Sequence, residues 1–185
     1  SGRTTEWIQF PQDSCPMGTI TLAIQLEQKD PSVGRVELML TLSQIKALDK
    51  ALEQYEKGEV LLAELCPRFG KTVWAMALFD HTDKQVMVAS SYVHSVFNSF
   101  KTDYVRFTQF EHIAIAESLE QVAQNTANGL RSLVVVPLTD NFSRWEKKYG
   151  WINKLTSKFV FVDEADFGAH KPSQVKKVKY LLENA

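Results

Sequence analysis

The chain has 185 residues, which is enough for one domain of ordinary size, and its 44% hydrophobic and 23% charged residues are typical of a globular protein. This composition excludes a disordered tail, and the longest apolar runs, such as 133–138, are far shorter than the roughly 20 residues of a membrane-spanning helix. Because 21 Lys and Arg stand against 22 Asp and Glu, binding to nucleic acid through bulk positive charge is also excluded, and any such contact must be local.

The cysteine count and the N-terminal sequence indicate a compartment. Cys15 and Cys66 are too few for a disulfide framework. The first twenty residues lack the basic and apolar blocks of a signal peptide. We therefore expect a cytoplasmic protein that has no membrane partner.

Residues 1–40 are expected to form a small N-terminal β extension. Residues 19–26 alternate between apolar and polar side chains as a strand does, and a turn is predicted over 29–34. Residues 36–40 then look like the returning strand, so the pattern predicts a β-hairpin.

From residue 41 to residue 185, short apolar strands alternate with helices. Strands are predicted over 60–65, 85–89, 104–108, 133–136 and 159–162. Helices are predicted over 41–55 (capped by Thr41 or Ser43), 71–79, 93–100, 119–127, 145–152 and 172–182. This alternation requires crossover connections, so it predicts an α/β fold with a mostly parallel sheet and helices on both faces.

The junction between the first of these strands and its following helix carries Gly70-Lys71-Thr72. Backbone N–H groups and the positive end of a helix dipole bind phosphate oxygens. At this place a lysine reaches the β and γ phosphates, and a threonine hydroxyl ligates Mg²⁺. The tripeptide therefore predicts a phosphate-binding loop.

The residues before this tripeptide depart from the usual phosphate-loop pattern. In G-x-x-x-x-G-K-[ST] the first glycine would fall at Leu65, and Arg68 stands two residues before Gly70 where another glycine is common. Arg68 and Phe69 would still lie in the loop. An ordinary helix start is the alternative interpretation.

The last predicted strand ends in the carboxylates Asp163, Glu164 and Asp166. Ligands of open α/β sheets bind at the carboxyl ends of the strands. Asp163 is placed to hold Mg²⁺ directly or through water, and Glu164 to accept a proton from an attacking water. A solvated acidic turn is the alternative, which the presence of Gly70-Lys71-Thr72 in the same chain disfavours.

Together, Gly70-Lys71-Thr72 and Asp163-Glu164-Ala165-Asp166 resemble motifs I and II of superfamily 2 helicases and translocases, in their first RecA-like domain. The second motif spells the tetrapeptide of the DEAD-box RNA helicases, whereas residues 67–72 are similar to loops of restriction and phage-defence proteins. The resemblance covers 42–166 and implies ATP and Mg²⁺ as cofactors.

Further segments extend the resemblance. Residues 42–48 resemble the family segment whose glutamine reads adenine, so Gln44 would contact the base; a surface glutamine on an amphipathic helix is an equal alternative. Residues 86–92 resemble motif Ia, and residues 133–139 lie where motif Ib would. Both motifs contact the nucleic-acid backbone in the family, with ordinary βα loops as the alternative here. The implied contacts are Ser90, Ser91, Tyr92 and Thr139.

The resemblance therefore implies the ATP-binding lobe of a nucleic-acid-dependent ATPase, a helicase or translocase that acts on DNA in preference to RNA. Its nucleotide-binding residues would be Gln44, Arg68, Phe69, Gly70, Lys71 and Thr72, its metal ligands Thr72 and Asp163, and its catalytic residues Lys71, Asp163 and Glu164. Motif III and a second RecA-like lobe with its arginine finger are not found in these 185 residues. We expect a monomer that hydrolyses ATP very slowly on its own.

Two other functions stay open. One is a non-motor phosphate-loop protein, such as a nucleotide switch or a kinase. The other is a degenerate RecA-like scaffold in which Arg68 abolishes nucleotide binding and the fold serves as an interaction surface. In the last helix, Lys171, Lys176, Lys177 and Lys179 are expected to form a solvated face, with a phosphate-facing patch or an interface with the second lobe as the alternative.

Overall fold

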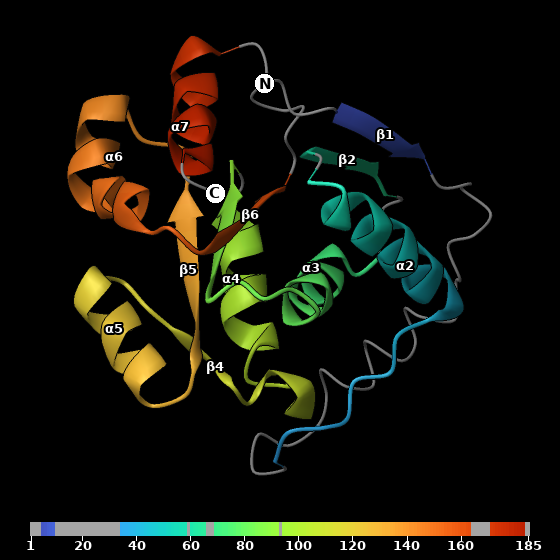
Figure 1. Cartoon of the computed structure of the whole chain (residues 1–185). Coiled ribbons are helices and arrows are strands. Elements are labelled where there is room, and N and C mark those ends of the chain that lie inside the picture. Colours follow the sequence, from blue (N-terminus) through green and yellow to red (C-terminus); the bar gives the residue numbers. More distant parts are fainter. Residues whose placement is uncertain are drawn as a thin grey trace. The chain divides into compact units, whose positions relative to one another are not determined.

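The computed structural model of the protein describes residues 5–9, 34–58, 60–65, 69–92, 94–163 and 171–183. The chain divides into two compact units, Ser1–His81 and Thr82–Ala185, and each is described by itself (Figure 1). The predicted hairpin strand at 19–26 lies outside the described residues. Labels of helices and strands follow Figure 1.

The first unit contains two parallel strands and two helices. Strand β1 (Thr5–Gln9) pairs in parallel with β2 (Val60–Glu64), and α2 (Leu42–Glu56) packs against β2 and against α3 (Lys71–Asp80). These bounds confirm the strand and the two helices predicted between residues 41 and 80.

The returning strand predicted over 36–40 is wrong beyond its first residue. Val36 makes a single β-bridge, and residues 37–40 have no regular structure. Met39 is 80% exposed and Leu42, at the start of α2, is 67% exposed. Met39 is therefore not packed on a sheet face, whereas Leu38 and Leu40 are half-buried without forming a strand.

The second unit contains a sheet of four parallel strands in the order β4-β5-β3-β6. The strands are β3 (Val86–Ser91), β4 (Ile113–Ile115), β5 (Arg131–Pro137) and β6 (Lys158–Asp163). Its helices are α4 (His94–Asp103), α5 (Leu119–Ala127), α6 (Phe142–Tyr149) and α7 (Pro172–Leu182), with 3-10 segments at Thr108–Phe110 and Gly150–Lys154. The predicted α/β fold with a parallel sheet is confirmed.

Helices cover both faces of this sheet, as predicted (Figure 1). On one face, side chains of β3, β5 and β6 form a core with α5, α6 and α7, in which Trp145 and Leu181 are fully buried. On the other face, Phe100 of α4 meets Phe161 of β6 edge to face, with 5.9 Å between ring centroids. Strands buried on both faces have the continuous apolar character that the sequence shows.

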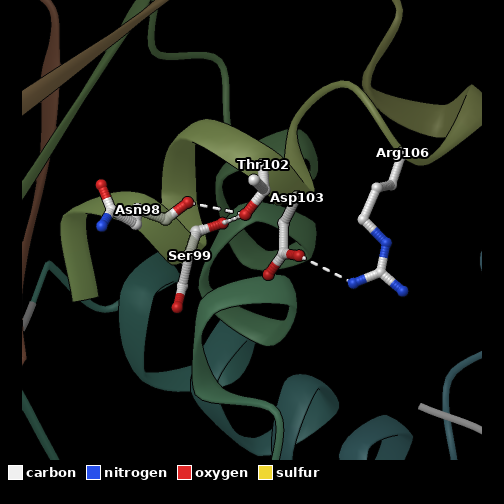
Figure 2. Close-up of polar contacts among 5 residues, drawn as sticks. All are labelled: Asn98, Ser99, Thr102, Asp103 and Arg106. Carbon is white, nitrogen blue, oxygen red and sulfur yellow. Dashed lines mark hydrogen bonds and ion pairs between the residues drawn. The ribbon is translucent and has the colours of Figure 1, made fainter. Parts of the chain in front are cut away.

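The C-terminal end of α4 is closed by local polar contacts (Figure 2). The Thr102 hydroxyl donates to the carbonyls of Asn98 and Ser99, at 2.6 and 3.1 Å. Arg106 then forms an ion pair with Asp103, at 3.2 Å. The backbone N–H of Arg106 also donates to the Asp103 carbonyl at 3.1 Å, and the chain turns at 104–106, directly after the helix.

This turn explains why the strand predicted over 104–108 is wrong. The chain turns at 104–106 and then forms the 3-10 segment Thr108–Phe110, and the strand comes later, at Ile113–Ile115. Phe107, which lies within the predicted strand, and Phe110, which follows it, are buried and pack edge to face at 6.0 Å. Their spacing of three residues suits a 3-10 turn, in which such side chains lie on one side.

Candidate functional site

The start of α3 has the geometry of a tight strand-to-helix turn. Gly70 precedes the helix in the left-handed conformation, with φ of 78° and ψ of 44°. The backbone conformation favours glycine, and a Cβ at this position would lie 2.8 Å from Nε2 of Gln44 and displace the end of that side chain. Phe69, one residue earlier, is buried and packs edge to face against Trp74 at 6.1 Å.

The first turn of α3 carries the lysine and threonine that the sequence singled out. The N-cap residue, Gly70, has no side chain with which to cap the helix, and the first turn of α3 contains no acidic residue. Lys71 and Thr72 are partly exposed there. A cation at a helix N-terminus is unfavourable because it faces the positive end of the dipole, whereas an anion bound there is favoured. This arrangement is therefore one that a bound anion would stabilise.

Gln44 links α2 to the loop before α3. Its Nε2 donates to the carbonyl of Phe69 at 2.8 Å, and its Oε1 accepts from the backbone N–H of Thr41 at 2.9 Å. The side chain is buried, so the alternative of a surface glutamine is wrong. Contact with adenine stays a prediction, and beyond these two bonds the amide has a second N–H and a second oxygen lone pair for the base.

The carboxyl ends of β3 and β6 bring a second group of predicted residues together. Asp163, the last residue of β6, is buried and lies in register with Ser91 of β3. Ser90 is also buried, and its hydroxyl donates to the carbonyl of Phe161 at 3.0 Å. Tyr92 follows and is buried, which raises the pKa of its hydroxyl above 10.0. The side chains of Ser90, Ser91 and Tyr92 therefore pack within the unit.

Thr139 differs from these residues because it is exposed, directly after β5. Buried side chains of α6 and α7 donate hydrogen bonds to the backbone carbonyls of the loop that carries it. Trp145 Nε1 donates to the carbonyl of Pro137 at 2.7 Å, and Lys177 Nζ donates to the carbonyls of Leu138, at 2.9 Å, and Asp140. Thr139 thus lies on a loop whose backbone is fixed by two buried side chains.

The buried position of Lys177 was not predicted from the sequence. It is 1% exposed, so it belongs neither to a solvated face nor to a phosphate-facing patch. Burial lowers the pKa of its ammonium group, and the Asp140 carboxylate opposes this shift. The signal that could have revealed it is the spacing of Gln174, Lys177 and Leu181, three buried residues on one stripe of α7.

The predicted site residues thus fall into two sets. The structure brings Gln44, Phe69, Gly70, Lys71 and Thr72 together in the first unit. It brings Asp163 and Ser91 together at the sheet edge of the second unit. Arg68 and Glu164 lie outside the described residues.

Within the described ranges, no group of three or more His, Cys, Asp and Glu side chains could hold a metal ion. The described helices also include none that is long and apolar enough to cross a bilayer. Comparisons of the chain with protein-family models, with curated proteins and with solved structures give no match. The functional interpretation therefore depends on the residues themselves.

Proposed function

We propose that this chain is the ATP-binding lobe of a nucleic-acid-dependent ATPase, a helicase or translocase that acts on DNA in preference to RNA in the cytoplasm. The observation that carries the proposal is the start of α3. A left-handed glycine, which has no side chain to cap the helix, leads there into a helix that begins with lysine and threonine. The motif resemblance of the sequence supplies the rest of the argument.

The proposed role of the first unit is to bind the phosphates of ATP. Gly70 lets the backbone approach the ligand closely because it has no Cβ, and the N–H groups at the start of α3 point toward the anion. Lys71 would neutralise the β and γ phosphates with charge-assisted hydrogen bonds. Phe69 and Gln44 hold the loop in place through the 2.8 Å bond between them.

Thr72 and Asp163 are the proposed ligands of Mg²⁺. A hydroxyl and a carboxylate are the hard oxygen donors that this ion takes in phosphate-loop proteins, together with phosphate oxygens and water. When bound, the ion would neutralise charge that develops on the transferring phosphoryl group. Glu164 is proposed to accept the proton of the attacking water.

Contacts with the nucleic-acid backbone are proposed for the exposed loop after β5. Thr139 can donate to a phosphate through its hydroxyl and its backbone N–H. Ser90, Ser91 and Tyr92 could contribute only through backbone groups, because their side chains are buried. Coupled hydrolysis would also require an arginine from a second lobe, whose contribution in related NTPases is on the order of 10³–10⁵ in rate.

The test is a titration of a fluorescent ATP analogue in the presence of Mg²⁺. Lys71→Ala should weaken binding roughly 10- to 100-fold, because charged hydrogen bonds to phosphate are lost. Asp163→Asn should remove most of the dependence on Mg²⁺. Lys46→Ala is the matched control, since Lys46 is exposed on the middle of α2.

Equal affinities of the wild type and Lys71→Ala would refute the phosphate-binding role. Absence of binding by the folded wild type would favour the scaffold alternative instead. Stimulation of ATP hydrolysis in a longer form of the protein, by single-stranded DNA more than by RNA, would then support the motor function.

A further inference from the structure

The second unit contains a groove that the proposed ATPase function does not use. The groove has a volume of about 500 Å³ and lies beside β5. Phe97 and Lys101 of α4 line one side of it, and Lys148 and Trp151, from α6 and the 3-10 segment after it, line the other. Its floor includes residues of β5 itself.

The groove begins where β4 ends. Ile115, the last residue of β4, lies opposite Leu133, and the next residue, Ala116, donates its N–H to the Leu133 carbonyl at 3.0 Å. Beyond this bond, β5 continues to Pro137, and no described residue pairs with it on the β4 side. Four residues of β5 therefore form an open strand edge, from Val134 to Pro137.

One residue of this edge, Val135, points both its backbone N–H and its C=O away from β3, toward the open side of the strand. Leu133 bonds toward β4, whereas the N–H of Leu138 donates to the Ser91 carbonyl of β3 at 3.0 Å. Because backbone groups alternate along a strand, Val135 points its N–H and C=O outward, where no described residue bonds to them. Pro137 has no N–H, and its carbonyl already accepts from Trp145.

The lining of the groove comes from both faces of the sheet. Val134 and Val135 point to opposite faces, yet both line the groove. Lys101 belongs to the helix that covers one face, and Lys148 to a helix that covers the other. A flat ligand lying on one face of the sheet would contact the lining residues of that face alone. An extended peptide chain that approaches the edge of β5 would contact the lining residues of both faces and the β5 backbone between them.

We propose that this groove binds a short, extended, acidic peptide segment, which pairs with Val135 as an added β-strand. Its backbone would exchange two hydrogen bonds with Val135, and its alternating side chains would reach both walls. Lys101 and Lys148 are exposed, and neither forms an ion pair with a described residue. The lining also includes Glu117, so two cations stand against one carboxylate, and the added strand would place a carboxylate against each lysine.

The structure also limits the length of this segment. The Leu133 carbonyl is already bonded to Ala116, and Pro137 offers no donor, so pairing is confined to the two groups of Val135. The remaining affinity must come from apolar side chains against Phe97 and Trp151 and from the two lysines. A blocked peptide with the sequence Gly-Glu-Val-Val-Glu-Gly meets these conditions, because its two glutamates point to opposite faces.

The test is a titration of the ¹⁵N-labelled protein with this peptide, followed by NMR. We expect the amide signal of Val135 to shift and its hydrogen exchange to slow, since the N–H gains an acceptor. Lys148→Glu should weaken binding roughly fivefold or more, because one attraction is replaced by a repulsion. Lys147→Glu is the matched control, since Lys147 is exposed next to Lys148 but does not line the groove.

A second peptide, methylated on the nitrogens of both valines, distinguishes strand pairing from charge attraction. Binding by the unmodified peptide alone supports the proposal. It is overturned if the methylated peptide binds equally well, if Lys147→Glu and Lys148→Glu weaken binding equally, or if no peptide binds. Binding of single-stranded oligothymidine in this groove, lost in Lys148→Glu while the peptide fails to bind, would overturn it in favour of a nucleic-acid site.

Discussion

The substitution Gly70→Ala tests the geometry at the start of α3 in a quantitative way. Gly70 has a positive φ of 78°, and an added Cβ would meet Gln44 Nε2 at 2.8 Å. The end of the glutamine side chain can move, but only by giving up its 2.8 Å bond to the Phe69 carbonyl. The substitution thus combines backbone strain with the loss of a buried hydrogen bond.

The chain contains a control that separates these two costs. Gly58, at the end of α2, has a φ of 73°, and a Cβ there would meet nothing within 4 Å. Gly58→Ala should therefore cost only the strain of a left-handed alanine, about 1–2 kcal/mol. Gly70→Ala should cost about 2–5 kcal/mol, because a buried hydrogen bond is lost and a buried carbonyl is left without its donor.

The assay is urea-induced unfolding followed by circular dichroism. The proteins compared are the single variants Gly58→Ala, Gly70→Ala and Gln44→Ala and the double variant Gln44→Ala/Gly70→Ala. In the double variant the added Cβ has no amide to meet, so the cost of the alanine should fall to that of Gly58→Ala. The reasoning is refuted if Gly70→Ala destabilises the protein no more than Gly58→Ala does, or if the costs of the two substitutions at positions 44 and 70 simply add.

Two further predictions concern the loop after β5. Because burial lowers the pKa of Lys177 below 10.5, the unfolded chain binds more protons than the folded one between the lowered pKa and 10.5, so the free energy of unfolding should rise with pH across that interval. Lys177→Met should reduce this slope, to which buried Lys158 also contributes, and Lys179→Met, at an exposed position, should leave it unchanged; equal slopes for both variants would contradict the argument. Trp145→Phe should cost about 2–4 kcal/mol in urea unfolding, because the ring is smaller and the bond from Nε1 to the Pro137 carbonyl is lost; a cost below about 1 kcal/mol would contradict the importance of that bond.

Most of the elements were predictable because their signals are local. The helix α5 occupies Leu119–Ala127 and α7 occupies Pro172–Leu182, the bounds predicted for them; Ser118 caps α5, and a proline stands at the start of α7. The parallel sheet followed from the alternation of apolar runs with helices. These features depend on residues that are neighbours in the sequence or one helical turn apart.

The errors concern residues whose environment is fixed only when the chain is folded. The apolar residues around Phe107 have the composition of a strand, but they are buried in a turn that the preceding ion pair closes. Lys177 looks like one more lysine of a solvated helix until α7 is packed against the loop at 138–140. The sequence contains the residue types but not the partners that fix their environment.

The two predicted functional loops share a further feature that depends on such partners. Gln44 donates to the carbonyl of Phe69, and Lys177 donates to the carbonyl of Leu138. Within a trans peptide the C=O and the following N–H point in opposite directions. The N–H groups of Gly70 and Thr139 are therefore oriented away from the side chains that hold these loops.

This orientation supplies a reason for placing buried donors behind both loops. A loop that binds an anion must present N–H groups outward, and its carbonyls must then be satisfied from the protein side. A glutamine amide and a lysine ammonium can donate to these carbonyls from the protein interior, where they do not compete with the loop N–H groups for the anion. The sequence motifs thus identify the loop residues that would face the anion. The buried donors from α2 and α7, which hydrogen-bond to the loop carbonyls, are identified only in the folded chain.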